Sequence, residues 1–296
     1  TYSDGKTIEP NHLLASTKKE TYKVKVQYKQ GLAADQLPDQ SKTYNFRFTV
    51  TYMQADNNAI QRKPISFATD SWSTIARYND SNVYQIGDEK EITMDVNGDG
   101  VDETYHIVIV NKTACTTETS ETACGLVLQF KELLNITNSS DQQMNTTATS
   151  VGGWPATNLY TYLNTTVYSK IPSDLKEHII NTTVVSGHGD GDSQNFTTND
   201  KLYILSTKEI GLPSSYDSVT IETRLLDYYE YGLSTSANTK RTKYSYGTNT
   251  ASIWWLRSAT MSSSSAFDHI ATSGGMSDHY GTATYSYGVL PAFRIG

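Results

Sequence analysis

The stretch DVNGDGVDE places oxygen-bearing side chains around a glycine-containing turn. Asp95, Asn97 and Asp99 alternate along the chain, and Glu103 occupies the ninth position of the stretch. This order matches the first half of an EF-hand-type calcium loop, in which carboxylate and amide oxygens surround the ion. The twelfth position, where a bidentate acid closes such a loop, is His106. Calcium is therefore one prediction for this stretch, and a tight hairpin turn that binds nothing is the other.

A second group of polar residues lies in the glycine-rich stretch SGHGDGDSQNF, which holds His188, Asp190 and Asp192. Such a group suits a metal site or acid–base chemistry, but the same glycines are also typical of a mobile connector. The sequence contains no HExxH, GxSxG, P-loop or GxGxxG motif. We therefore expect a protein that is not an enzyme, and a hydrolase built on this loop is the weakest alternative.

The two cysteines, Cys115 and Cys124, bracket eight polar residues between two apolar runs. A disulfide between them would close a short loop and stabilise the fold by roughly 2–3 kcal/mol in the chain-entropy description. Such a bond forms in an oxidising compartment, so an extracellular or cell-surface location is expected. The alternative is a pair of free thiols. The chain begins at Thr1, and we expect a leader or anchor to have been removed.

The composition excludes several classes of protein. The 296 residues are 37% hydrophobic and 19% charged, which is enough apolar mass for a sizeable core. No apolar run approaches the roughly 20 residues that a membrane-spanning helix needs. The formal charge of −7 opposes binding to nucleic acid, because such binding depends on Lys and Arg that neutralise phosphates.

The first 56 residues show a period of two that is typical of strands. In TYKVKVQYK the apolar residues alternate with Lys and Gln, and TYNFRFTVTY repeats the pattern. We predict a small antiparallel β module over residues 1–56, resembling stalk or pilin modules, and a second domain over 57–296. The module has too little core to stand alone. It is expected to dock on the second domain or to mediate self-assembly with a neighbouring molecule.

Helical and strand patterns mix in the second domain, which predicts an α+β fold. Apolar spacing and capping residues predict helices over 70–78, 154–171 and 172–183. A hairpin is predicted over 89–110 and a buried strand over 201–207.

The end of the chain sets two apolar phrases, IWWLRSA and YGVLPAFRI, around a small and polar middle. The phrases are predicted to be core strands, with Trp254, Leu256 and Phe293 buried. The planar guanidinium in WWLRS suits several backbone carbonyls or a carboxylate.

These two phrases resemble the ending of a C-type-lectin-like family of gut bacteria and phages, which is related in fold to formylglycine-generating enzymes. They also resemble the variable proteins of diversity-generating retroelements. GGWPATNLYTYLN, IPSDLKEHIINTTVVSGHG and DKLYILSTKEI extend the resemblance over about residues 60–296. It implies a C-type-lectin-like domain that follows the β module, with the residues between the phrases exposed on a ligand-binding face.

Two departures limit what the resemblance implies. The catalytic cysteine pair of formylglycine-generating enzymes is absent, because Cys115 and Cys124 both lie in another loop. Leu290 stands where Arg or Ser is common, and we have no interpretation for it. The resemblance therefore implies recognition and not that family's catalysis.

The middle segment is rich in Ser, Gly, Tyr, Asp and His, which are typical of antibody-like binding surfaces. A Ser-rich surface loop without a partner is the alternative. The expected ligand-binding residues are Met261, Ser262, Ser263, Ser264, Asp268, His269, Met276, Asp278, His279 and Tyr280. The expected ligand is a protein or glycan at a cell or phage surface. A structural, pilin-like filament subunit is the competing function.

Overall fold

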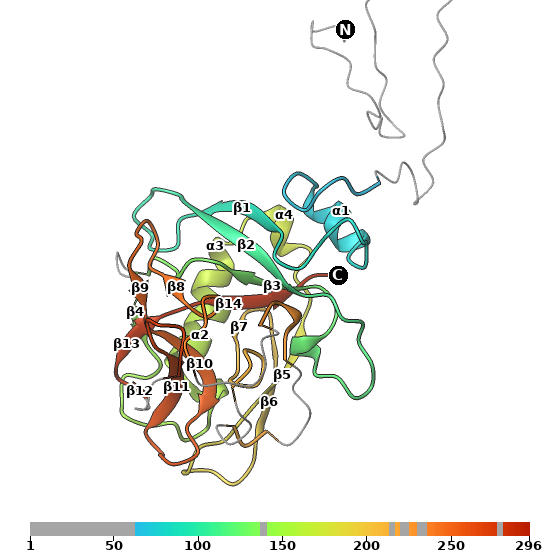
Figure 1. Cartoon of the computed structure of the whole chain (residues 1–296). Coiled ribbons are helices and arrows are strands. Elements are labelled where there is room, and N and C mark those ends of the chain that lie inside the picture. The colour runs from blue at the N-terminus through green and yellow to red at the C-terminus, as the bar shows by residue number, and fades with distance from the viewer. Residues whose placement is uncertain (1–62, 137–140, 213–216, 220–224, 230–235, 277–280) are drawn as a thin grey trace, which may run out of the picture. The chain divides into compact units, whose positions relative to one another are not determined.

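The computed structural model describes residues 63–136, 141–212, 217–219, 225–229, 236–276 and 281–296 (Figure 1). The β module predicted over residues 1–56 lies outside these described residues. The module and its boundary with the second domain therefore stay predictions.

One five-stranded sheet has the order β1-β2-β3-β14-β7, with every neighbouring pair antiparallel. Its strands are β1 (Glu89–Met94), β2 (Glu103–Asn111), β3 (Val127–Phe130), β14 (Pro291–Arg294) and β7 (Tyr203–Ile204). The hairpin predicted over 89–110 is confirmed as β1 and β2. The last phrase of the sequence, in β14, lies between β3 and β7, so the predicted core strand there is also confirmed.

A second five-stranded sheet has the order β12-β11-β10-β13-β4, with β10 at its centre. Its strands are β12 (Gly281–Thr282), β11 (Ala266–Ile270), β10 (Trp254–Ala259), β13 (Ser286–Gly288) and β4 (Asp141–Gln143). The pair β10–β13 is parallel, and the other pairs are antiparallel. All six residues of β10 are buried, as the apolar phrase WWLRSA predicts.

Two short ribbons complete the described strands. They are β5 (Thr182–Ser186) with β6 (Phe196–Asp200), and β8 (Lys243–Tyr244) with β9 (Ala251–Ser252). The SGHGDGD stretch connects β5 to β6 and therefore forms a hairpin loop.

The first described helix, α1 (Trp72–Arg77), confirms the prediction over 70–78. Ser71 caps it by accepting a hydrogen bond from the backbone N–H of Thr74, and Trp72 and Ile75 are buried.

The helix predicted over 154–171 is confirmed as an almost continuous run. It consists of the 3₁₀ turn η3 (Trp154–Ala156), α2 (Asn158–Tyr162), the π-helical turn η4 (Leu163–Val167) and α3 (Tyr168–Lys170).

The helix predicted over 172–183 is only partly correct. Helix α4 (Ser173–Lys176) ends early, and residues from Thr182 onward form β5. The β-branched run TTVV favours a strand over a helix. Two further 3₁₀ turns are η2 (Glu121–Ala123) and η6 (Asp227–Tyr229).

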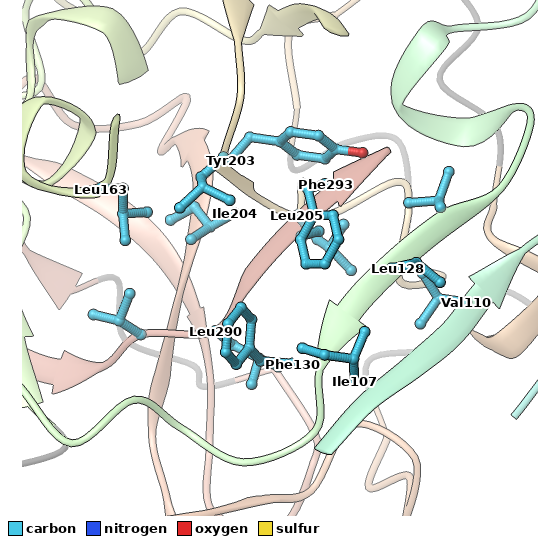
Figure 2. Packing of buried hydrophobic residues seen from close by; sticks show 14 of the residues in the cluster. Ile107, Val110, Leu128, Phe130, Leu163, Tyr203, Ile204, Leu205, Leu290 and Phe293 are labelled. Carbon is cyan, nitrogen blue, oxygen red and sulfur yellow. The ribbon is translucent and has the colours of Figure 1, made fainter. Parts of the chain in front are cut away.

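Figure 2 shows the packing between the first sheet and the helical run. The rings of Phe130 and Phe293 lie 6.3 Å apart, edge to face. Leu163 enters the same cluster from η4. Trp254, Leu256 and Phe293 are fully buried, as predicted.

None of the helices in the described part of the chain has the length and apolarity to cross a membrane. With two five-stranded sheets and short helices, the described part of the chain has a sheet-rich α+β fold.

The disulfide predicted between Cys115 and Cys124 is present, with their Cα atoms 4.7 Å apart. It closes the loop between β2 and β3, and η2 lies inside that loop.

Candidate functional site

The turn between β10 and β11 places small polar residues and one apolar residue at the surface. Met261 is 45% exposed, and Ser262 and Ser264 are also exposed. Ser263 is half-buried, and its hydroxyl accepts a hydrogen bond from the backbone N–H of Ser265 at 3.2 Å. The exposure predicted for the first part of the segment between the two apolar phrases is therefore present at this turn.

A second segment, residues 150–153, lies against this turn. The backbone N–H of Ser150 donates to the carbonyl oxygen of Ser264 at 2.8 Å. The Ser150 hydroxyl donates to the carbonyl oxygen of Ser263 at 3.3 Å. The neighbouring Val151 is 50% exposed, so it adds apolar surface close to the turn.

The loop between β5 and β6 is the third segment at this surface. A Cβ atom on Gly189 would lie 3.0 Å from the carbonyl oxygen of Ser263 and 3.1 Å from the Ser150 hydroxyl. A glycine therefore allows the loop to approach so closely. The Asp192 carboxylate accepts a hydrogen bond from the backbone N–H of Gly152 at 2.9 Å, and Asp190 is exposed.

We call this combination of residues 150–153, 187–192 and 260–265 the turn surface. It offers hydroxyl groups, backbone groups, carboxylates and the side chains of Met261 and Val151. Such a surface can make both hydrogen bonds and apolar contacts with a partner. No pattern in the sequence connects Val151 or Asp190 with Met261. The glycine spacing in SGHGDGD and SVGGW was the available signal, because close backbone contact requires residues without a side chain.

Asp268 and His269 do not lie at the surface, so the expectation that they are exposed is wrong. They are only 1% and 3% exposed, because β11 is covered on both faces and pairs with β10 and β12. The His269 ring lies 6.1 Å from the ring of Trp255 and 4.8 Å from that of Tyr287. Both residues contribute to the interior behind the turn surface.

The environment of Asp268 favours the protonated carboxyl group. Burial raises its pKa to about 8, a hydrogen bond from Thr260 opposes that rise, and the nearby carboxylate of Asp217 adds to it. The Thr260 hydroxyl lies 3.0 Å from one carboxyl oxygen of Asp268, and the other oxygen has no hydrogen-bond partner among the described residues.

Of the remaining predicted ligand-binding residues, the structure describes Met276 alone, and it does not join the turn surface. Met276 is half-buried and forms a bridge with Ile270, at the end of β11 that lies away from the turn. Asp278, His279 and Tyr280 lie outside the described residues. Met276 is therefore a position separate from the turn surface, and the part of the predicted face at Asp278, His279 and Tyr280 stays a prediction.

A buried ion pair joins β10, the strand that leads into the turn, to Glu209 in the loop after β7. The two terminal nitrogens of the Arg257 guanidinium contact the two carboxylate oxygens of Glu209 at 2.6 and 2.5 Å, and both side chains are fully buried. Arg257 also donates to the carbonyl oxygens of Ile204 and Val185, at 2.9 and 3.3 Å. The sequence predicted a carboxylate or carbonyl partner for this arginine, but it did not identify Glu209.

The predicted calcium residues form a turn that its own backbone satisfies. One carboxylate oxygen of Asp95 accepts from the backbone N–H groups of Gly98 and Asp99, at 2.7 and 3.1 Å. The other accepts from Gly100 at 3.2 Å. Asn97 donates to the carboxylate of Asp99 at 3.0 Å. These contacts are those of a hydrogen-bonded hairpin turn.

Glu103 is buried, and both of its carboxylate oxygens already have partners within the protein. It accepts hydrogen bonds from the backbone N–H of Val96 at 3.1 Å and from Asn135 at 3.0 Å. Within the described ranges, no group of three His, Cys, Asp or Glu side chains is arranged to hold a metal ion. The geometry favours the turn over the calcium site.

The polar residues of the SGHGDGD loop also bind within the protein. The Nδ1 atom of His188 lies 2.8 Å from the carbonyl oxygen of Gly189, and the backbone N–H of His188 donates to Asn195 at 3.2 Å. With Asp190 exposed and Asp192 held by Gly152, the three residues form no shared acid–base centre in the structure.

The DUF6273 family, a domain of unknown function, matches residues 125–296. No curated protein and no solved structure matches the chain. The matched range contains the whole turn surface, Arg257 and Glu209, whereas Asp95 and Cys115 precede it. Because the match spans more than half of the chain, the protein belongs to the DUF6273 family.

Proposed function

We propose that the protein is an extracellular recognition protein with a C-type-lectin-like domain and that it binds its ligand at the turn surface. The resemblance of the IWWLRSA and YGVLPAFRI phrases supports the domain type. The sheet-rich α+β class agrees with it. The disulfide supports an oxidising compartment, and the ligand is a protein or glycan at a cell or phage surface.

One observation carries the proposal. A fully buried strand, β10, leads directly into an exposed turn that two other loops support. Side chains on this turn can change with little cost to folding, because exposed substitutions typically alter stability by less than about 0.5 kcal/mol. Binding and folding are thus assigned to different residues, as recognition surfaces require.

A binding screen with single substitutions tests the proposal. The labelled full chain is applied to a glycan array and to intact bacterial cells. A Met261→Arg substitution is expected to abolish binding to the array glycan or cell that the unmodified chain binds, because it places a long charged side chain on the exposed turn between β10 and β11. The matched control is Val83→Arg, since Val83 is similarly exposed, at 41%, but lies in the loop between α1 and β1.

The outcome is decided by comparing the two variants. Loss of binding with Met261→Arg alone supports the turn surface as the site. Equal binding by Met261→Arg and the unmodified chain, or equal loss with Val83→Arg, contradicts it. Thermal melting of both variants excludes loss of fold as the cause.

The proposal also includes a more specific claim, that a retroelement diversifies the residues of this surface. It requires a reverse transcriptase gene near the gene for this chain, and an adenine-rich near-copy of the codons for residues 254–290. Sequencing the neighbouring DNA tests this part, and the absence of such a near-copy would leave a recognition protein with a fixed surface.

A further inference from the structure

The disulfide lies beside a positive charge from the last strand. The Nη2 atom of Arg294, in β14, lies 3.3 Å from Cys115 Sγ and 4.0 Å from Cys124 Sγ. Its Nη1 atom lies 3.4 Å from the carboxylate of Glu121. One guanidinium therefore reaches both sulfur atoms of the bond.

Gly125 leaves space for this contact. Its φ of +68° favours glycine, and a Cβ atom there would lie 3.3 Å from Arg294 Nη2 and 3.7 Å from Cys115 Sγ. The backbone next to Cys124 thus both turns sharply and leaves room for the guanidinium to approach the disulfide.

The two cysteines of the disulfide differ in their exposure to solvent. Cys115 is exposed, whereas Cys124 is fully buried. An incoming thiolate therefore reaches the Cys115 sulfur first, and the Cys124 sulfur departs as the thiolate. A nearby guanidinium stabilises a cysteine thiolate relative to the thiol.

We propose that Cys115–Cys124 is an exchange site for small thiols, in which Arg294 stabilises the departing thiolate. In the first step a small thiolate bonds to Cys115 Sγ, and the bond to Cys124 Sγ breaks. In the second step another small thiolate attacks the small-molecule sulfur of the mixed disulfide and releases Cys115 as a thiolate. Two small thiols are oxidised to one disulfide, the protein disulfide is reduced to two cysteines, and the thiol protons pass to the two cysteines through solvent.

The loop that this bond closes also contacts the buried ion pair. Thr122 donates a hydrogen bond to Glu209, and Arg257 lies 3.5 Å from the Thr122 hydroxyl. Glu121 accepts from the backbone N–H of Thr183 at 2.6 Å. The loop that the disulfide closes therefore contacts both the buried ion pair and β5.

The test measures how fast glutathione reduces the oxidised full chain, with alkylation of the freed cysteines and intact-mass detection. Arg294→Met is expected to slow reduction about tenfold, because the leaving thiol loses its stabilising charge. Arg294→Lys, which keeps the charge, is expected to restore much of the rate. Arg77→Met, on the exposed side of α1, removes a cation elsewhere and is expected to leave the rate unchanged.

Whether Arg294→Met slows or speeds reduction distinguishes stabilisation of the departing thiolate from simple covering of the disulfide. If Arg294 only covers the bond, Arg294→Met exposes the sulfurs and speeds reduction. An unchanged or faster rate in Arg294→Met overturns the proposal and leaves the proposed recognition function unaffected.

A second measurement does not depend on the folding of Arg294→Met. In a Cys124→Ser chain, the rate of Cys115 alkylation is followed against pH. Cys115 is expected to titrate below the ordinary thiol pKa of about 8.5. Titration at or above that value also overturns the proposal.

Discussion

Arg257 and Glu209 form a two-pronged ion pair with no exposure to solvent, at distances of 2.6 and 2.5 Å. They join the centre of the second sheet to the loop that follows β7. Removing one partner would leave the other charge buried and uncompensated, which typically costs about 3–5 kcal/mol.

Glu209→Gln is therefore expected to lower the free energy of unfolding by about 3–5 kcal/mol in urea denaturation. The matched control is Glu89→Gln, because Glu89 pairs with Lys131 at 2.8 Å with both side chains partly exposed. Exposed pairs typically contribute less than about 1 kcal/mol. Equal losses in the two variants would contradict the structural importance assigned to the buried pair.

Trp254→Ala is expected to lower the free energy of unfolding by about 3–5 kcal/mol, because it opens a cavity in the core. It also removes the indole N–H that donates to the carbonyl oxygen of Arg241 at 2.9 Å. Met261→Ala, seven residues later on the exposed turn, is expected to change the same quantity by less than about 0.5 kcal/mol. Urea denaturation checks both, and a large loss with Met261→Ala would show that the turn is part of the core.

The pH dependence of stability is expected to report on Asp268. Its pKa rises from 3.8 to about 8 on folding, so the folded state binds this proton more tightly. The contribution is complete below about pH 4 and is lost as the pH rises toward 8. Asp268→Asn resembles the protonated carboxyl group, so it is expected to flatten this loss and raise the unfolding free energy at pH 8. Asp190→Asn, at an exposed site, is the control. Identical pH profiles for Asp268→Asn and the unmodified chain would show that Asp268 does not titrate in this window.

The DVNGDG turn is expected to melt at the same temperature with calcium and with a chelator. Its Asp95 oxygens already accept three backbone hydrogen bonds, and the Glu103 carboxylate already accepts from the backbone N–H of Val96 and from Asn135. Differential scanning calorimetry measures this. A higher melting temperature in calcium that Asp99→Ala removes would instead support the calcium site.

Local pattern and short separations in the sequence determined several features of this protein. The alternation around DVNGDG predicted the β1–β2 hairpin, because a tight turn joins neighbouring strands. The ten-residue CTTETSETAC stretch predicted the disulfide, because so short a loop holds its ends close together. The aromatic phrase WWLRSA predicted a buried strand, because burying large apolar side chains is strongly favourable.

Tertiary structure alone decided which residues share the turn surface and what covers β11. Asp268 and His269 are expected from the sequence on an exposed ligand-binding face, yet they lie in β11, which pairs with β10 and is buried along its whole length. Residues 150–153 and 187–192 meet the turn from positions far away in the chain, and Glu209 meets Arg257 in the same way. Sequence periodicity reports the faces of one element at a time. It does not indicate which distant element packs against each face, and that packing determines which residues form the turn surface.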